Sequence, residues 1–186
     1  MKRRTLAAPI AVAYLGSVVL ANWLTTHYGF IDVGFGEMAT AGTFAAGGAL
    51  VVRDFLQDAV GRLGVAALII IGAGLSYLVA DPFIAKASGC AFLVSEALDM
   101  VVYTPLRKRA KRFGDVRWAL AVTVAMVFGA VADTVVFLWV AFGRAAVMPA
   151  LPGQLIGKAE VAAALIALGM VSGRAVLRQP VNTEGA

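Results

Sequence analysis

The chain has 186 residues, of which 61% are hydrophobic and only 15% are charged, and its mean hydropathy is +0.86. A soluble domain carries about 25% charged residues, so this composition excludes an ordinary soluble protein and indicates an integral membrane protein. The net charge of +5 does not predict nucleic-acid binding, because most basic residues flank apolar segments, where the positive-inside rule explains them.

Motifs that would predict an enzyme are absent from the sequence. There is no phosphate-binding loop, dinucleotide-binding glycine pattern, zinc-ligand spacing or nucleophile elbow. The single cysteine, Cys90, and the single histidine, His27, cannot build a disulfide framework or a metal site on their own. We therefore expect a protein that is not an enzyme and that holds no cofactor and no metal.

Six segments are predicted to cross a membrane, since about 20 apolar residues in a helix span a bilayer. The first follows the basic cluster Lys2–Arg4 without a cleavage signal and is predicted to be retained. A loop, Gly143–Gly153, is expected before the last. The expected fold class is an all-α integral membrane protein, a bundle of six transmembrane helices in one domain, residues 1–186. The predicted spans are Leu6–Thr26, Met38–Val52 with a polar continuation to Gly61, Gly64–Ala80, Pro82–Leu106, Trp118–Phe142 and Leu155–Leu177.

The basic residues are distributed unequally between the two predicted sides of the membrane. Of the 16 lysines and arginines, all but Lys86, Arg144 and Lys158 fall on the side of the termini. By the positive-inside rule, and with an even number of crossings, both termini are expected in the cytoplasm. The protein is therefore expected to be a multi-pass protein of the inner (plasma) membrane.

The first two spans contain an amide and a run of small residues. Asn22 lies near the outer end of the first span, and a glycine-rich outer loop, Gly29–Glu37, follows it. The small side chains of Met38–Val52 predict close packing against other helices, and room for a flat ligand is the alternative. In the polar continuation, Arg53 and Asp54 are predicted to belong to a cytoplasmic cap.

The fourth span carries two carboxylates inside an apolar run. It starts at Asp81-Pro82, an N-cap residue followed by proline at the first helical position. Glu96 and Asp99 share a helix face because they lie three residues apart, and Asp133 in the fifth span is a third acid in an apolar run. Each carboxylate near the centre of a bilayer costs about 2.5–3.5 kcal/mol on insertion scales, so each needs a compensating interaction.

Two interpretations of these acids are open. They are either a structural set neutralised by neighbouring helices or a lysine, or a polar pocket or proton relay, the usual role of ionisable groups in a membrane. Three acids against one lysine suit a ligand rich in hydrogen-bond donors, and amides can both donate and accept. The candidate polar residues, which four helices could bring to one cavity, are Asn22, Glu96, Asp99, Asp133, Gln154 and Lys158.

A series of short motifs runs in order along nearly the whole chain. They are Ala21-Asn22, TAGTF at Thr40–Phe44, RDFLQDAVGR at Arg53–Arg62, ASGCAFLVSEALDMVVYTPLRKR at Ala87–Arg109, Asp133-Thr134 with Phe137, AFG at Ala141–Gly143, and Gln154 with Lys158. As a series these motifs resemble those of the queuosine precursor transporters, also called vitamin uptake transporters (VUT family), especially the shorter actinobacterial and phage branch.

This resemblance implies a bundle similar to the substrate-binding components of energy-coupling-factor transporters, working without a dedicated ATPase. It implies secondary transport of queuosine precursors for tRNA modification, the deazaguanine bases preQ0 or preQ1, across the inner membrane. The expected partners are this purine-like small molecule and the lipid bilayer, with no nucleic acid. Glycine-rich helix faces are compatible with a homodimer.

The resemblance also implies roles for the candidate residues. Glu96 or Asp99 would accept both N–H donors of a guanine-like edge in a bidentate contact. Gln154 or Asn22 would donate to the carbonyl oxygen, Lys158 would be the counter-charge of the acids, and aromatic rings would stack on the base. The expected substrate-binding residues are Asn22, Phe92, Glu96, Asp99, Tyr103, Asp133, Phe137, Gln154 and Lys158.

Two other functions remain as alternatives. The chain would be the substrate-binding subunit of an energy-coupling-factor vitamin transporter if a partner ATPase docked on the small-residue segment Ala39–Val52. It would be a structural membrane protein if its carboxylates only neutralised lysine and backbone groups. Within the leading hypothesis, Asp133 could instead carry a proton, and Trp139 is a further candidate for stacking.

Overall fold

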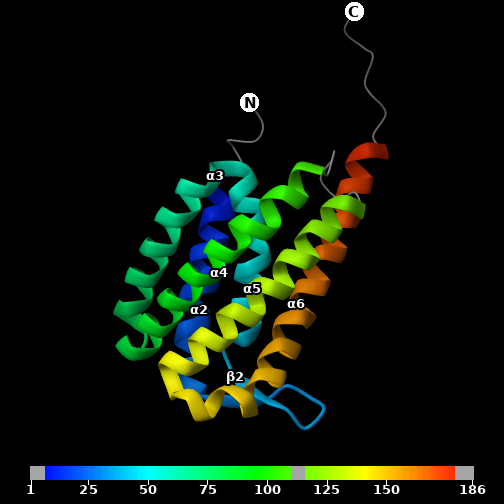
Figure 1. Ribbon diagram of the computed structural model, residues 1–186. Coiled ribbons are helices and arrows are strands. Elements are labelled where there is room, and N and C mark those ends of the chain that lie inside the picture. The colour runs from blue at the N-terminus through cyan, green and yellow to red at the C-terminus, as the bar shows by residue number, and fades with distance from the viewer. Residues whose placement is uncertain (1–6, 110–115, 179–186) are drawn as a thin grey trace, which may run out of the picture.

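The computed structural model describes residues 7–109 and 116–178, apart from the side chains at 58, 99–100, 104, 107–109 and 172–178. This part of the chain forms long helices and one two-stranded hairpin (Figure 1). In order, the elements are α2 (Ala7–Tyr28), β1 (Phe30–Asp32), β2 (Met38–Thr40), α3 (Thr43–Val79), α4 (Pro82–Arg109), α5 (Val116–Phe142) and α6 (Arg144–Arg178). The predicted all-α class is confirmed in outline, with the hairpin as an addition.

The start of α2 and the end of α6 lie at the same end of the helix bundle, and the hairpin lies at the other end (Figure 1). α2 packs along α3, α4 packs along α5, and α5 packs along α6. This course agrees with an even number of crossings. Which end faces the cytoplasm stays a prediction.

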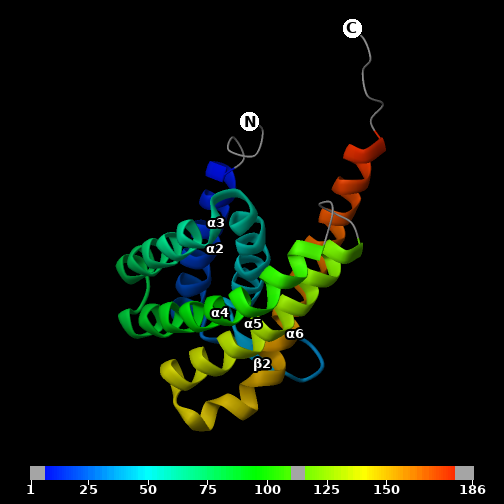
Figure 2. The same ribbon diagram turned by 45° about the horizontal axis from the view of Figure 1, so that its top comes forward.

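Gly61 divides α3 into two arms that run in opposite directions (Figures 1 and 2). Its backbone angles, φ 74° and ψ 176°, are accessible essentially only to glycine. The arm before Gly61 corresponds to the second predicted span with its polar continuation, and the arm after it corresponds to Gly64–Ala80. The polar stretch is therefore helical up to a tight turn.

The hairpin corrects the predicted start of the second span. The strands β1 and β2 pair antiparallel; β1 lies within the expected outer loop Gly29–Glu37, and β2 follows that loop directly. Asp32 stabilises the turn, because its Oδ1 accepts a hydrogen bond from the Gly34 N–H at 2.6 Å. The helix begins at Thr43, so the prediction of helix from Met38 is wrong. A short apolar strand cannot be told from the first turn of a buried helix by hydrophobicity alone.

The predicted start of the fourth span is confirmed. The Asp81 carboxylate accepts hydrogen bonds from the backbone N–H groups of Phe83 at 2.8 Å and Ile84 at 3.1 Å. These bonds satisfy two of the N–H groups that a helix leaves without an internal partner at its first turn. Asp81 therefore caps the N-terminus of α4, as the sequence predicts.

The predicted loop Gly143–Gly153 is wrong, because α6 already begins at Arg144. Pro149 and Pro152 lie inside this helix. Proline removes one backbone hydrogen bond and kinks a helix, but neighbouring elements can hold the helix together across the kink. In Figure 2 the first part of α6 crosses the hairpin end of the bundle before the helix turns along α5.

Four segments are long and apolar enough to cross a membrane by length and composition: Ala7–Tyr28, Ala59–Val79, Val116–Phe142 and Arg144–Val171. They support a multi-pass membrane protein. The first arm of α3 and helix α4 are not among them, and these two segments carry the buried ionic groups Arg53, Asp54 and Glu96. For these two segments a membrane crossing stays a prediction.

Small residues bring α3 close to α6. A Cβ added at Gly47 would lie 2.7 Å from the Cα of Lys158, and one added at Gly157 would lie 2.8 Å from the Thr43 Cγ2. The predicted close packing is therefore confirmed. Since residues 39–52 are mostly buried against the rest of the chain, the expectation that Ala39–Val52 forms a free docking face for an ATPase is wrong.

Candidate functional site

A small cavity lies near the hairpin end of the bundle, where all five helices and β2 contribute to its wall. Six of the nine expected site residues line it: Asn22, Phe92, Asp133, Phe137, Gln154 and Lys158. The volume of free space is about 20 Å³, which is room for about one water molecule. A heterocycle can enter only if the lining side chains or helices move.

Gln154 is held by two threonines from the opposite wall. Its Oε1 accepts a hydrogen bond from the Thr43 hydroxyl, and its Nε2 donates to the Thr40 Oγ1 at 2.8 Å. The two hydroxyl oxygens lie 3.2 Å apart. This closed ring of three side chains joins α6 to β2 and the start of α3.

Lys158 forms a buried ion pair between α6 and α5. Its Nζ donates to the Asp133 Oδ2 at 2.5 Å and to the Thr134 Oγ1 at 2.7 Å. Lys158 is only 1% exposed, so its predicted place among the outer-side charges is wrong. The ammonium group keeps a third N–H, and among the described residues nothing is bonded to the Asp133 Oδ1. The pair therefore offers the cavity one donor and one acceptor without net charge.

Asn22 presents an acceptor to the cavity. Its Nδ2 donates to the Val18 carbonyl oxygen at 3.1 Å and to the Ser76 Oγ at 2.9 Å. Because a carbonyl oxygen can only accept, the atom that faces Val18 has to be the amide nitrogen. The Asn22 Oδ1 is thus the end left to accept a hydrogen bond from a ligand.

Two of the four expected aromatic rings reach the cavity. Phe92 and Phe137 line it from α4 and α5. Trp139 is 60% exposed on the outside of the bundle, and Tyr103 is buried in a separate apolar cluster with Trp118. Only Phe92 and Phe137 are therefore placed to stack on a bound ring.

Glu96 does not join the other acid, and the prediction of one shared acidic cluster is wrong. Its Oε2 accepts a hydrogen bond from Arg53 at 2.9 Å, and Arg53 also pairs with Asp54 at 3.1 Å. Glu96 is absent from the residues that line the cavity. Within the described part of the chain, Glu96 and Asp133 thus belong to separate ionic clusters, because each has its own basic partner. The Asp99 side chain lies outside the described residues.

Sequence reasoning missed the hydroxyl groups of the cavity and the buried role of Arg53. Thr25, Thr40, Thr43 and Ser88 line the cavity. Thr40 and Thr43 lie inside the TAGTF motif, which could have drawn attention to them. Ser88 lies likewise inside the motif at Ala87–Arg109, whereas Thr25 lies outside every motif of the series. Arg53 was expected in a cytoplasmic cap, but it is 2% exposed.

A comparison with protein families gives one match. The profile of the family described as "Putative vitamin uptake transporter" matches residues 79–172, just over half of the chain. The chain belongs to this family. The resemblance inferred from the motifs is therefore confirmed at the family level. No curated protein and no solved structure matches the chain significantly.

The region shared with the vitamin uptake transporters covers α4, α5 and most of α6. It contains Phe92, Asp133, Gln154 and Lys158, which line the cavity. Asn22, in α2, lies outside the shared region. In a vitamin uptake transporter the cavity at which all the helices meet is the candidate substrate site.

Proposed function

We propose that this protein is a secondary transporter of the inner membrane for a queuosine precursor, preQ0 or a related 7-deazaguanine base, and that the cavity near the hairpin is its substrate site. One observation carries the proposal. Asn22 from α2, Asp133 from α5, and Gln154 and Lys158 from α6 meet beside two phenylalanine rings, although α2 is far from α5 and α6 in the sequence.

The polar atoms that these side chains offer to the cavity match the hydrogen-bonding edge of a guanine-like base. Such an edge presents ring N–H and amine donors next to a carbonyl acceptor. The Asp133 Oδ1 and the Asn22 Oδ1 would accept from the donors, and the third N–H of Lys158 would donate to the carbonyl oxygen. Asp133 thereby takes the role that the sequence suggested for Glu96 or Asp99.

The charge balance of the cavity favours a neutral ligand. Lys158 already neutralises Asp133 at 2.5 Å, so the wall carries no net charge among the described residues. A cationic ligand would have to give up its hydration without meeting a spare negative charge, which is costly in a buried site. We therefore expect preQ0, which is neutral, to bind more tightly than preQ1, whose aminomethyl group is cationic.

The small volume of the cavity fits a transporter that encloses its substrate. A purine-sized ring needs several times the present space of about 20 Å³. Binding would have to displace Phe92, Phe137 or the closed ring around Gln154. A ligand that binds one arrangement of the helices better than another shifts the population between them, and this coupling is the basis of transport.

A thermal-shift screen of the purified protein tests the proposal. The ligands are preQ0, preQ1, guanine, riboflavin and biotin. A ligand at about 100 times its Kd stabilises the folded state by about 2.7 kcal/mol, so a specific ligand raises the melting temperature. We expect the largest rise with preQ0. Stabilisation by riboflavin or biotin, with none by the deazaguanines, would contradict the proposed substrate.

A pair of phenylalanine variants tests the site itself. Stacking of a base on an aromatic ring contributes about 1–3 kcal/mol, so Phe137→Leu should weaken preQ0 binding by about fivefold or more. Phe128→Leu is the matched control, since Phe128 lies on the same helix and is 56% exposed. It should leave preQ0 binding unchanged. Equal affinity in both variants would place the substrate elsewhere.

A further inference from the structure

A buried ion pair links α3 to α4. Its arginine has a second ionic partner on its own helix, which differs from the situation of its glutamate. Arg53 on α3 pairs with Glu96 on α4 at 2.9 Å and with its own neighbour Asp54 at 3.1 Å. All three residues are at most 3% exposed. Since Asp54 sits on the same helix as Arg53, it moves with the guanidinium whenever the two helices separate. Glu96 has no such companion among the described side chains of α4.

The pair lies between the cavity and the end of the bundle that is predicted to face the cytoplasm. Along α4, Glu96 is about 6 Å beyond Phe92, which lines the cavity, at 1.5 Å of rise per residue. Along α3, Arg53 is about 10 Å beyond Ala46, which also lines it. Both displacements point away from the hairpin end. An opening of the cavity towards the cytoplasm between α3 and α4 would pass through this pair.

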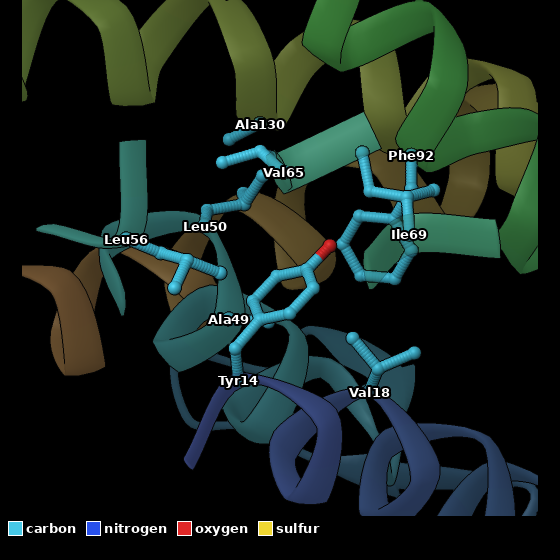
Figure 3. Packing of buried hydrophobic residues seen from close by; sticks show 9 residues of the cluster. All are labelled: Tyr14, Val18, Ala49, Leu50, Leu56, Val65, Ile69, Phe92 and Ala130. Atoms are coloured by element: carbon cyan, nitrogen blue, oxygen red, sulfur yellow. The ribbon is translucent and has the colours of Figure 1, made fainter. Parts of the chain in front are cut away.

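The second oxygen of Glu96 is buried without a hydrogen-bond donor in the described part of the chain, and so is the hydroxyl of Tyr14. The Tyr14 ring reaches from α2 to Phe92, one helical turn before Glu96, with 6.5 Å between the ring centroids (Figure 3). A buried acceptor without a donor is unfavourable. A proton on the Glu96 Oε1 would turn this acceptor into a donor.

Among the charged groups of the described residues, Glu96 is the one expected to change its charge during opening. The guanidinium of Arg53 keeps its proton in any protein environment. Asp54 stays beside Arg53, and Asp133 on α5 stays beside Lys158. Of these acids, Glu96 is the one whose cation lies across the contact between α3 and α4, so these helices can separate before water enters only if Glu96 is neutral. A buried carboxylate without a cation takes up a proton rather than remain charged.

We infer that Glu96 is the proton-binding site of this transporter and that the Arg53–Glu96 pair is its inner gate. A proton that reaches the Glu96 carboxylate from the cavity side removes the charge on α4 that pairs with Arg53, and α3 and α4 separate. Cytoplasmic water then accepts the proton from Glu96, and the carboxylate recaptures Arg53. Each cycle moves one proton inward with the substrate. This inference rests on the proposed transport function.

The first experiment needs no substrate. In a Cys90→Ser background, Ser95→Cys places a thiol next to Glu96 at a position that is 1% exposed. Because only the thiolate reacts with a water-soluble maleimide, the labelling rate of the folded protein is divided at each pH by the rate of the same variant after unfolding. This ratio should rise as the pH falls from mildly alkaline to mildly acidic. With Glu96→Gln added, which imitates the protonated acid, the ratio should be high and independent of pH. Glu160→Gln, at an exposed position on α6, should behave like the parent. A pH-independent ratio in the parent would overturn the inference.

The second experiment measures transport of preQ0 in proteoliposomes. An inward proton gradient should accelerate uptake by the wild-type protein and by Glu160→Gln, and a protonophore should abolish the acceleration. Glu96→Gln should still exchange preQ0 for preQ0 but should lose the acceleration and the accumulation. Gradient-driven accumulation by Glu96→Gln would overturn the inference.

Two further outcomes separate this inference from the proposed function. If the wild-type protein neither binds nor exchanges preQ0 while the labelling ratio follows Glu96, the substrate proposal fails and the proton-controlled gate is supported. If Glu96→Gln cannot be purified, Glu96→Asp keeps a carboxylate on a shorter side chain and should shift the pH midpoint of labelling. An unchanged midpoint in that variant would overturn the inference.

Discussion

The ion pair between Lys158 and Asp133 determines the net charge of the cavity wall. Both are at most 5% exposed, and their charged atoms lie 2.5 Å apart. Either charge alone would destabilise the fold at this depth, because the free energy needed to remove an ion from water exceeds the stabilisation that a few protein dipoles provide. The pair therefore stabilises the fold and is also a candidate for contact with the substrate. Single and double variants can separate these two roles.

Removing one partner should destabilise the protein strongly. Lys158→Met leaves the Asp133 carboxylate buried without its cation, and the expected loss is about 3–5 kcal/mol in the free energy of unfolding. The double variant Lys158→Met/Asp133→Leu removes both charges and should regain most of this loss. Thermal unfolding of the purified protein in detergent measures both effects.

The double variant also separates a structural pair from a substrate site. Under the proposed function it should unfold near the wild-type temperature but should no longer be stabilised by preQ0. If preQ0 still raised its melting temperature by the wild-type amount, the pair would be purely structural. That result would favour the alternative that the protein is a structural membrane protein.

At the scale of elements, the contact between α3 and α6 depends on the absence of side chains. Gly47 faces the backbone of α6, and a Cβ there would lie 2.7 Å from the Lys158 Cα. Backbone atoms cannot give way as a flexible side chain would. The two helices would have to move apart, and the position of Lys158 would shift with them.

Gly47→Ala should therefore lower the free energy of unfolding by about 1–3 kcal/mol, the usual cost of overpacking. Gly74→Ala is the matched control, since Gly74 lies in the second arm of the same helix with no neighbouring atom within 4 Å of an added Cβ. Alanine there should be neutral or stabilise by about 0.5–1 kcal/mol. Equal melting temperatures for the two variants would argue against the close approach of α3 to α6.

Element boundaries were predictable where a local signal acts through the backbone. Asp81 and Pro82 start α4 as expected, because the side chain of Asp81 bonds to the first N–H groups of its own helix. Pro149 and Pro152 misled the prediction for α6. A proline weakens a helix locally, but packing of the surrounding elements decides whether the helix ends there.

For the whole molecule, the two ends of the bundle should lie on opposite sides of the membrane. The excess of basic residues near the chain ends predicts that this end faces the cytoplasm. Phe35, between β1 and β2, and Leu63, just after the Gly61 turn, are each 89% exposed. They are equally accessible markers of the two ends.

Single cysteines at these two positions test the orientation. In a Cys90→Ser background, Phe35→Cys should react with a membrane-impermeant maleimide added to intact cells. Leu63→Cys should react only after the cells are permeabilised. The reverse pattern would invert the predicted topology and place the cavity at the cytoplasmic side.

The sequence by itself determined the class of molecule, its approximate helices, and the charged and amide residues that line the cavity, but not the hydroxyl groups. Composition and periodicity are sufficient for this, because an apolar helix has to carry its few polar groups towards other helices rather than towards lipid. Asn22, Asp133 and Gln154 could be selected for this reason before any helix was placed.

Only the tertiary structure decided which acid belongs to which base. Glu96 pairs with Arg53, and Asp133 pairs with Lys158. In the sequence these charges are interchangeable, because electrostatic attraction depends on distance, and the distances follow from the order, kinks and depth of the helices. One acid therefore lines the cavity, and the other lies beneath it in the link between α3 and α4.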